Sequence, residues 1–320
     1  MSEAQNKIGT LKNYLETQII GQEDLVNKLL ITMLADGHAL VEGAPGLAKT
    51  KAIKTLSGCI KATYNRIQFT PDLLPSDITG SEIYVAQKGE FAFRQGPVFA
   101  NLVLADEINR APAKVQSALL EAMAERQVSV GGKRYALPEL FMVMATQNPI
   151  EHEGTYNLPE AQLDRFLMYI KIDQPEAETE HKILNLVRGE AKNVKTESFS
   201  PLSIEDILIA RKEVQDVHMS EALEEYIVQL VIATRHPERY DQELAGKVLY
   251  GASPRATIAL DKCSKIHAWL SNRDFVTPED VQAVVYDILR HRIILTFEAQ
   301  AEGFQSDDII ESLLKVVPLP

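Results

Sequence analysis

A loop of small residues that ends in a Lys-Thr pair follows directly on the apolar run 38–41 and constrains the fold more than any other feature. Glycine and alanine let backbone N–H groups approach phosphate oxygens, and a helix beginning at such a loop adds partial positive charge. Lys49 is placed to reach the β- and γ-phosphates of a nucleotide, and the Thr50 hydroxyl to ligate Mg²⁺. The loop consists of Gly43, Ala44, Pro45, Gly46, Leu47, Ala48, Lys49 and Thr50.

Ala48 departs from the phosphate-loop pattern, which has glycine directly before the lysine. This position joins the helix, where helical backbone angles suit alanine, so the cost is one methyl group near the phosphate. A small-residue turn alone is more often an ordinary connection between a strand and a helix. The preceding strand and the Lys-Thr pair together favour nucleotide binding.

Two adjacent carboxylates, Asp106 and Glu107, follow the apolar run 102–105. Such a run is typical of a parallel strand covered on both faces, and ligands bind at the carboxyl ends of these strands. We expect Asp106 to hold Mg²⁺ and Glu107 to orient and deprotonate the water that attacks the γ-phosphate. The alternative is that both acids merely begin the next helix, where the helix dipole favours negative charge. The upstream Lys-Thr loop favours an ATPase site.

Composition narrows the class of protein. The 320 residues suffice for two domains. A net charge of −12 argues against non-specific binding to nucleic acid or to anionic membranes. Cys59 and Cys263 are far apart, which predicts free thiols in a reducing cytoplasm rather than a disulfide framework. The first ten residues do not resemble a signal peptide, and no apolar run is long enough to span a bilayer.

Alternating strand and helix patterns predict an α/β domain with a five-stranded parallel sheet. Residues 3–35 have helical periodicity, with a turn at 18–22. The expected strands are 39–41, 66–69, 102–105, 141–145 and 166–172. Alternating runs also predict two hairpins, at 83–93 and 128–135, whose aromatic residues we expect to pack across the strands rather than form a contact surface.

After Ile172 the strand signals stop and helical periodicity dominates. Ser253-Pro254 and Thr277-Pro278 each combine an N-cap residue with proline at the first helical position. We therefore expect an α/β core at residues 1–174 and a helical domain at 175–320.

Long motifs make the chain resemble the MoxR family of AAA+ ATPases. They are QFTPDLLPSDITG at 68–80, FRQGPVFAN at 93–101, LADEINRAP at 104–112 and GTYNLPEAQLDRF at 154–166, with Asn157 where proline is common. The resemblance is dense from about residue 21 to 172 and thinner around 251–256 and 277–290. It implies an AAA+ core followed by a helical lid, and Ala48 is similar to what this family has before the lysine.

The resemblance assigns further residues. Asn148 matches the polar sensor that positions the attacking water, and its amide can both donate and accept; alternatively it starts an Asn-Pro turn. Arg165 matches the arginine finger, or forms a local ion pair with Asp164. Arg255 matches the lid arginine that senses the γ-phosphate, or is a solvated first-turn arginine. The turn containing Ile20 and Gly21 matches the adenine site. ATP would then lie between the two domains.

The function implied by the resemblance is Mg²⁺-dependent ATP hydrolysis in a ring, six-membered by family likeness, that remodels or activates protein partners. MoxR-like proteins are often associated with proteins carrying a von Willebrand factor A domain. Two alternatives remain at this point: a nucleotide-gated binding protein or scaffold with negligible turnover, and a motor subunit like that of magnesium chelatase. A nucleic-acid motor is disfavoured by the acidic charge.

Overall fold

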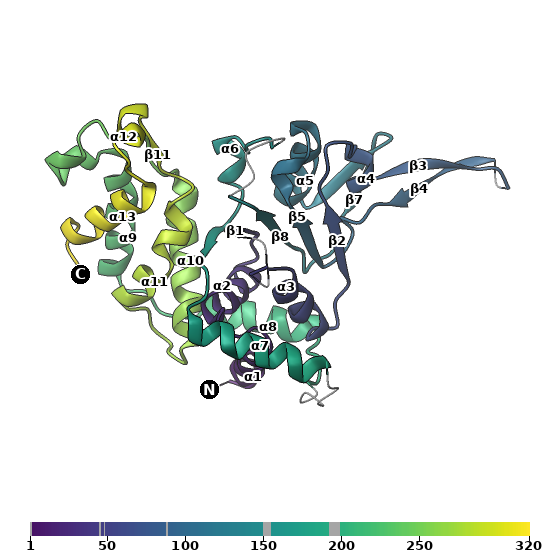
Figure 1. Ribbon diagram of the computed structural model, residues 1–320, viewed down its shortest axis with the longest axis horizontal. Helices are drawn as coiled ribbons and strands as arrows, with labels where there is room; N and C mark the ends of the chain where they lie inside the picture. The colour runs from purple at the N-terminus through teal and green to yellow at the C-terminus, as the bar shows by residue number, and fades with distance from the viewer. Residues whose placement is uncertain (1, 45, 48, 88, 150–154, 192–198) are drawn as a thin grey trace.

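The computed structural model describes residues 2–44, 46–47, 49–87, 89–149, 155–191 and 199–320 (Figure 1). Pro45 and Ala48 of the predicted phosphate loop therefore lie outside the described residues, as does part of the last family motif. Within the described part, no helix is both long and apolar enough to cross a bilayer.

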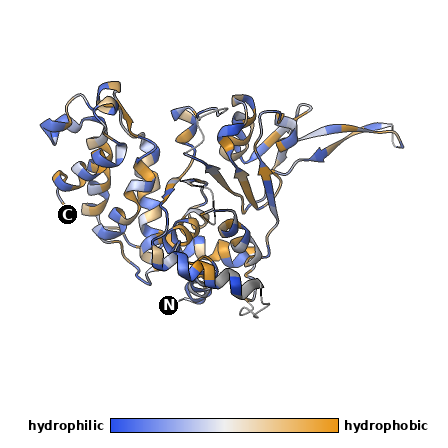
Figure 2. Ribbon diagram, viewed as in Figure 1, coloured by the Kyte–Doolittle hydropathy of each residue, from blue (hydrophilic) through white to orange (hydrophobic). Residues whose placement is uncertain are grey.

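A five-stranded parallel sheet forms the centre of the molecule, as predicted. Its order is β2 (Tyr64–Gln68), β5 (Leu102–Asp106), β8 (Met142–Gln147), β1 (Ala39–Gly43) and β9 (Met168–Ile172). The three inner strands β5, β8 and β1 are almost entirely buried, which agrees with their unbroken apolar sequences. Figure 2 shows the hydrophobic colouring of these central strands.

Alternation along each strand divides the core into two layers. In β5, Leu102 and Leu104 join one buried apolar cluster, whereas Val103 and Ala105 join another on the opposite face. The helices α1 (Glu3–Gln18), α2 (Glu23–Leu34) and α3 (Lys49–Gly58) contribute to the first cluster, and α5 (Ala113–Glu125) to the second. The result is a three-layer α/β/α core.

Two antiparallel hairpins extend from the core. The first pairs β3 (Gly80–Val85) with β4 (Glu90–Gln95) after the short helix α4 (Pro75–Thr79), and it projects far from the body (Figure 1). The second pairs β6 (Gln127–Val130) with β7 (Lys133–Ala136). Phe93 and Tyr135 stack between the hairpins with ring centroids 4.0 Å apart, so the two hairpins support each other.

The region after β9 is helical, as predicted, with one exception. The strands β10 (Val248–Tyr250) and β11 (Ile294–Leu295) form a short antiparallel pair that the sequence did not indicate. Ser253 caps α10 by accepting from the N–H of Arg255, so the predicted N-cap there is confirmed. The helices are α7 (Ala177–Ala191), α8 (Ile204–Gln215), α9 (Glu221–Arg235), α10 (Pro254–Leu270), α11 (Pro278–Leu289), α12 (Phe297–Ala301) and α13 (Ser306–Val316).

The two predicted domains share a common apolar core. Ile8 of α1 and Leu30 of α2 belong to the same buried cluster as Ile207 of α8 and Leu260 of α10. Figure 1 shows α7 and α8 beside α1, below the sheet, while α9 to α13 form a separate stack. The helical region therefore packs on the N-terminal helices, and the boundary at residue 174 stays a prediction.

Candidate nucleotide-binding site

The predicted phosphate loop lies at the carboxyl edge of the sheet, between the end of β1 and the start of α3. Gly46 has φ +87°, a conformation that L side chains rarely adopt. At Gly43, an added Cβ would come within 3.1 Å of both the side chain and the carbonyl of Ile172. The local backbone and packing thus account for glycine at both positions, and the exposed Gly46 lies beside a helix N-terminus, where anions bind.

Lys49 is the first residue of α3, and its side chain reaches across two neighbouring strands. The amino group donates to the carbonyl of Gly43 at 2.5 Å and to that of Gln147 at 3.3 Å. These carbonyls end β1 and β8, so the cation lies directly over the sheet edge. This position suits a lysine that contacts phosphate oxygens.

Asp106 ends β5 with both carboxylate oxygens engaged. One oxygen accepts from the Thr146 hydroxyl at 2.6 Å, and the other accepts from Arg66 Nη2 at 2.6 Å and Nε at 3.1 Å. The Asp106 side chain is only 13% exposed, which limits its rotation. The carboxylate is consequently fixed beside β8, one strand from the phosphate loop.

Glu107 has a left-handed backbone, with φ 56° and ψ 51°. This conformation costs of the order of 1–3 kcal/mol in a non-glycine residue and tends to occur at functional sites. The N–H of Glu107 donates to the Thr146 hydroxyl at 2.9 Å, and its carboxylate accepts from Gln68 at 2.8 Å and Arg110 at 2.9 Å. Thr146 therefore orients the Asp106 carboxylate as a donor and holds the Glu107 backbone as an acceptor.

Asn148 follows β8 immediately, and its side chain is buried at the same sheet edge. The register of β1 with β8 pairs Glu42 with Gln147, so Asn148 is level with Gly43. Lys49, Asp106, Glu107 and Asn148 are thus brought together at the ends of three adjacent strands.

A cavity of about 290 Å³ lies on the other side of the phosphate loop, between the α1–α2 turn and the start of α7. Gly21, Leu25, Ile172 and Thr179 line it. Gly21 has φ +76°, and an added Cβ would come within 2.0 Å of Thr179 Cγ2, so only glycine permits this close approach. The apolar residues of this lining are outnumbered by polar ones, and the adenine site stays a prediction. Ile20 is half-buried nearby but does not line the cavity.

Arg165 and Arg255 lie together at the opposite edge of the sheet. Arg165 precedes β9 by three residues, and β9 runs parallel to β1 with Met168 beside Ala39 and Ile172 beside Gly43. A strand of this length spans about 16 Å, so these arginines are at the amino edge while the phosphate loop is at the carboxyl edge. The expectation that a single chain holds ATP between its phosphate loop and Arg255 does not fit this arrangement.

Asp164 connects Arg255 to Arg292. Its carboxylate accepts from Arg255 Nη1 at 3.3 Å and from Arg292 Nε at 2.8 Å, and the Ser253 hydroxyl donates to it at 3.2 Å. Arg165 instead donates to the Leu120 carbonyl at 2.7 Å. The alternative in which Arg165 merely pairs with Asp164 is therefore not what the structure contains, and the Arg165 side chain remains exposed.

The end of α11 binds the chain that leads into β9. Arg290 donates to the Tyr169 carbonyl at 3.2 Å, Arg292 donates to the Phe166 carbonyl at 2.8 Å, and His291 Nε2 lies 3.1 Å from the same oxygen. The His291 imidazole is fully buried, and this desolvation lowers its pKa well below the usual value, so the ring is neutral and donates. The helical region is thereby joined to the edge that carries Arg165.

Sequence reasoning missed several residues of the site, namely Arg66, Gln68, Arg110 and Thr146, and it named Asp164 only as a possible partner of Arg165. One signal was available for two of them. Arg66 and Gln68 alternate in β2 with the buried Ile67, so they share a face at the strand that neighbours β5. Their pairing with Asp106 and Glu107 depends on strand register, which the pattern does not specify.

Two family models match parts of the chain. A model of the ATPase family associated with various cellular activities (AAA) matches residues 38–168, and a model of the AAA lid domain matches residues 244–313. The chaperone MoxR1 of Mycobacterium tuberculosis is 46% identical over 306 residues, which cover 94% of this chain and 79% of MoxR1. The chain belongs to the MoxR family of AAA+ ATPases.

Sequence similarity to other proteins, and structural similarity to one, extends over nearly the whole chain. The uncharacterised protein YeaC of Bacillus subtilis is 43% identical, covering 98% of this chain and 95% of YeaC. The protein MoxR of Methylorubrum extorquens is 32% identical, covering 94% and 92%. A crystal structure of a candidate ATPase from Cytophaga hutchinsonii superposes with a TM-score of 0.90 at 48% identity, covering 99% of this chain and 96% of that one.

The oxygen donors at the carboxyl edge of the sheet are suited to a Mg²⁺ ion that is also bound by nucleotide phosphates. The described residues contain no group of three or more histidine, cysteine or acidic side chains that could hold a metal by themselves. Mg²⁺ commonly takes one or two protein ligands and completes its shell with substrate phosphates and water. Thr50 in the first turn of α3 and Asp106 at the end of β5 supply oxygen donors of that kind.

Proposed function

We propose that this chain is a Mg²⁺-dependent ATPase that assembles head to tail into a ring and uses hydrolysis to remodel protein partners. The observation that supports this most is the division of the site between two edges of the sheet. Lys49, Asp106, Glu107 and Asn148 lie at one edge, whereas the exposed Arg165 and Arg255 lie at the other. One chain therefore offers an incomplete site, and a second copy completes it.

Each residue of the carboxyl edge then has a role. Lys49 and the loop N–H groups hold the phosphates, and Gly21 borders the adenine. Thr50 and Asp106 would hold Mg²⁺, which supplies neutralisation of charge on the β- and γ-phosphate oxygens. Glu107, oriented by Gln68 and Arg110, accepts a proton from the attacking water that Asn148 positions.

The arginines act on the ATP of the neighbouring chain. Arg165 and Arg255 belong to one exposed cationic edge whose backbone is fixed by the α11 contacts and by Asp164. A permanently charged guanidinium suits the charge that develops on the γ-phosphate, and in trans such residues raise rates on the order of 10³–10⁵-fold. Identical subunits that meet head to tail close into a ring if the rotation closes, here a hexamer by family likeness.

The partners are proteins rather than nucleic acid. A relative is named as a chaperone, the chain carries a net charge of −12, and Tyr84 and Phe91 are exposed on the projecting β3–β4 hairpin. We propose that client proteins bind to this hairpin. Proteins that carry a von Willebrand factor A domain are the first class to test. Both cysteines are buried and free, which suits a reducing cytoplasm.

Steady-state phosphate release tests the ATPase directly. Lys49→Ala should abolish nucleotide binding, because it removes the cation at the phosphates. Glu107→Gln should keep ATP binding and lower turnover by roughly two to four orders of magnitude, since only the proton acceptor is lost. Glu298→Gln, the same substitution at an exposed glutamate on α12, is the control and should be neutral. Normal turnover by Glu107→Gln would refute the assignment of Glu107, and negligible turnover by the wild type would favour a nucleotide-gated scaffold.

A further inference from the structure

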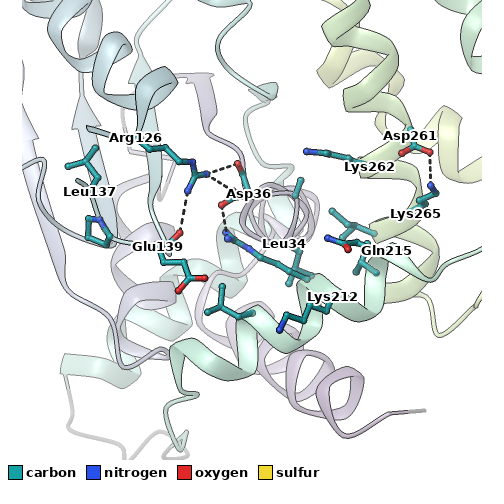
Figure 3. A pocket seen from close by; sticks show the side chains of 16 residues that line it. Leu34, Asp36, Arg126, Leu137, Glu139, Lys212, Gln215, Asp261, Lys262 and Lys265 are labelled. Atoms are coloured by element: carbon teal, nitrogen blue, oxygen red, sulfur yellow. Dashed lines mark hydrogen bonds and ion pairs between the residues drawn. The ribbon is translucent and has the colours of Figure 1, made fainter. Parts of the chain in front are cut away.

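A cleft of about 750 Å³ lies between the end of α2, the segment before β8, α8 and α10 (Figure 3). Leu34, Leu137, Val214 and Ile266 form part of its apolar lining. The cleft is separate from the phosphate loop and from the adenine-side cavity, neither of which shares a lining residue with it. A space of this volume with an apolar floor can accept a ligand or a protein segment.

The wall of the cleft is preformed by an ion-pair cluster. Asp36, which has φ 59°, is held by Arg126 at 2.6 Å and by Arg211 at 2.6 Å. Arg211 is largely buried and also donates twice to the Met33 carbonyl, at 3.0 and 2.7 Å. These contacts fix the end of α2 against α8, so the cleft does not depend on a bound partner for its shape.

The cleft is cationic although the chain as a whole carries a net charge of −12. Five lysine or arginine residues and three acidic residues line it. Asp36 pairs with both Arg126 and Arg211, so one of these two positive charges is not balanced by it; Lys265 pairs with Asp261 at 2.8 Å, and Glu139 is the third acid of the lining. Lys212 on α8 and Lys262 on α10 are exposed and, within the described part of the chain, have no carboxylate partner. Figure 3 shows Lys262 extending from α10 toward Asp36 and Arg126.

The cleft continues into the edge that carries the two arginines. A neighbouring cavity of about 430 Å³ is lined by Arg165 and Arg255, and it shares Asp36, Arg126 and Lys262 with the cleft. In the head-to-tail assembly proposed above, this edge faces the next subunit. The cleft therefore lies beside the proposed contact with the next subunit's nucleotide.

The opposite edge of the same chain carries a complementary charge. The segment 173–180, next to the adenine-side cavity, contains the exposed acids Asp173, Glu176, Glu178 and Glu180. Glu178 is 82% exposed and pairs with Lys182 of its own helix at 2.9 Å. An acidic segment beside the nucleotide of one copy would meet a lysine-bearing cleft beside the arginines of the next.

We propose that the cleft receives the segment Asp173–Glu180 of the next copy of this chain, with Lys212 and Lys262 opposing its carboxylates. This inference rests on the proposed head-to-tail assembly. It adds the surface that sets the orientation of one subunit relative to the next. Charge complementarity of this kind mainly fixes orientation and excludes wrong contacts. The proposal predicts that assembly of the ring depends on charged residues that do not contact the ATP.

Sedimentation velocity of the full chain with a slowly hydrolysed ATP analogue tests the inference. Lys212→Glu with Lys262→Glu should weaken association by about tenfold or more, because like charges then face each other. Glu178→Lys with Glu180→Lys should do the same. All four substitutions in one chain should restore association, since the charges are exchanged. Arg239→Glu, an exposed cation elsewhere in the helical region, is the matched control.

The outcomes separate this inference from the proposed function. Circular dichroism melts and binding of a fluorescent ATP analogue establish that each variant is folded. If the wild type associates and the lysine variant associates equally well, the cleft assignment is wrong while the ring stands. Loss of binding to a carboxymethylated unfolded protein with normal association would assign the cleft to clients and also overturn the inference. A wild type that stays monomeric with nucleotide overturns both.

Discussion

The Asp164 carboxylate is expected to contribute strongly to the free energy of unfolding. It lies between the buried Arg292, 3% exposed, and the exposed Arg255, 61% exposed. Removing one partner of a buried ion pair costs about 3–5 kcal/mol, and Asp164 is one-fifth exposed, so we expect Asp164→Asn to cost roughly 2–3 kcal/mol in urea unfolding. Arg255→Ala should cost less than about 1 kcal/mol, because exposed pairs contribute little. Equal losses for the two variants would contradict this account.

His38 makes a second residue-scale prediction, about pH. Its Nδ1 accepts from the Val143 N–H at 3.0 Å, and burial lowers its pKa to about 4. The unfolded chain takes up this proton near pH 6.5, so the stabilisation present above that pH is lost as the pH falls toward 4. The difference amounts to about 3 kcal/mol at most. His38→Gln should flatten the fall in free energy of unfolding between pH 7 and 4; an unchanged slope would show that His38 is protonated when folded.

At the scale of elements, the β3–β4 hairpin is exposed yet supported. Tyr84 and Phe91, 60% and 66% exposed, contact each other with centroids 5.4 Å apart, so they both pack across the strands and present a surface. Serine at both positions should leave basal ATP hydrolysis unchanged and abolish its stimulation by a carboxymethylated unfolded protein. Phe297→Ser, an 80% exposed aromatic on α12, is the control. Retained stimulation in the hairpin variant would place client contact elsewhere.

Elements were predictable from the sequence where their signal is local. The inner strands 102–105 and 39–41 are apolar on both faces, and the phosphate loop and the Asp106-Glu107 pair are continuous in sequence. Strand ends were less accurate, since Tyr64 and Gln147 are polar residues within strands. The β10–β11 pair has too few residues to show alternation. The packing of α8 on α1 and the bonds of Arg66 and Thr146 depend on tertiary register, which periodicity does not encode.

At the scale of the whole molecule, the two halves of the site face away from each other. The parallel sheet separates the phosphate edge from the arginine edge by the length of a strand, and Asp164, next to Arg165, holds Arg255 on the arginine edge. A hydrolysis site would therefore form only between copies, and the rate should rise with protein concentration as chains associate. This expectation distinguishes the account from any in which one chain hydrolyses ATP alone.

Mixing two inactive variants tests whether the hydrolysis site forms between neighbouring chains. Arg165→Ala should bind ATP almost normally and hydrolyse it poorly, and Glu107→Gln should behave likewise, each lacking one half of the site. In mixed rings the intact Arg165 of one chain meets the intact Glu107 of its neighbour, so phosphate release should exceed the sum of the separate variants. Subunit exchange is verified with fluorescently labelled chains. A mixture that exchanges subunits yet hydrolyses no more ATP than its separate components would contradict the account.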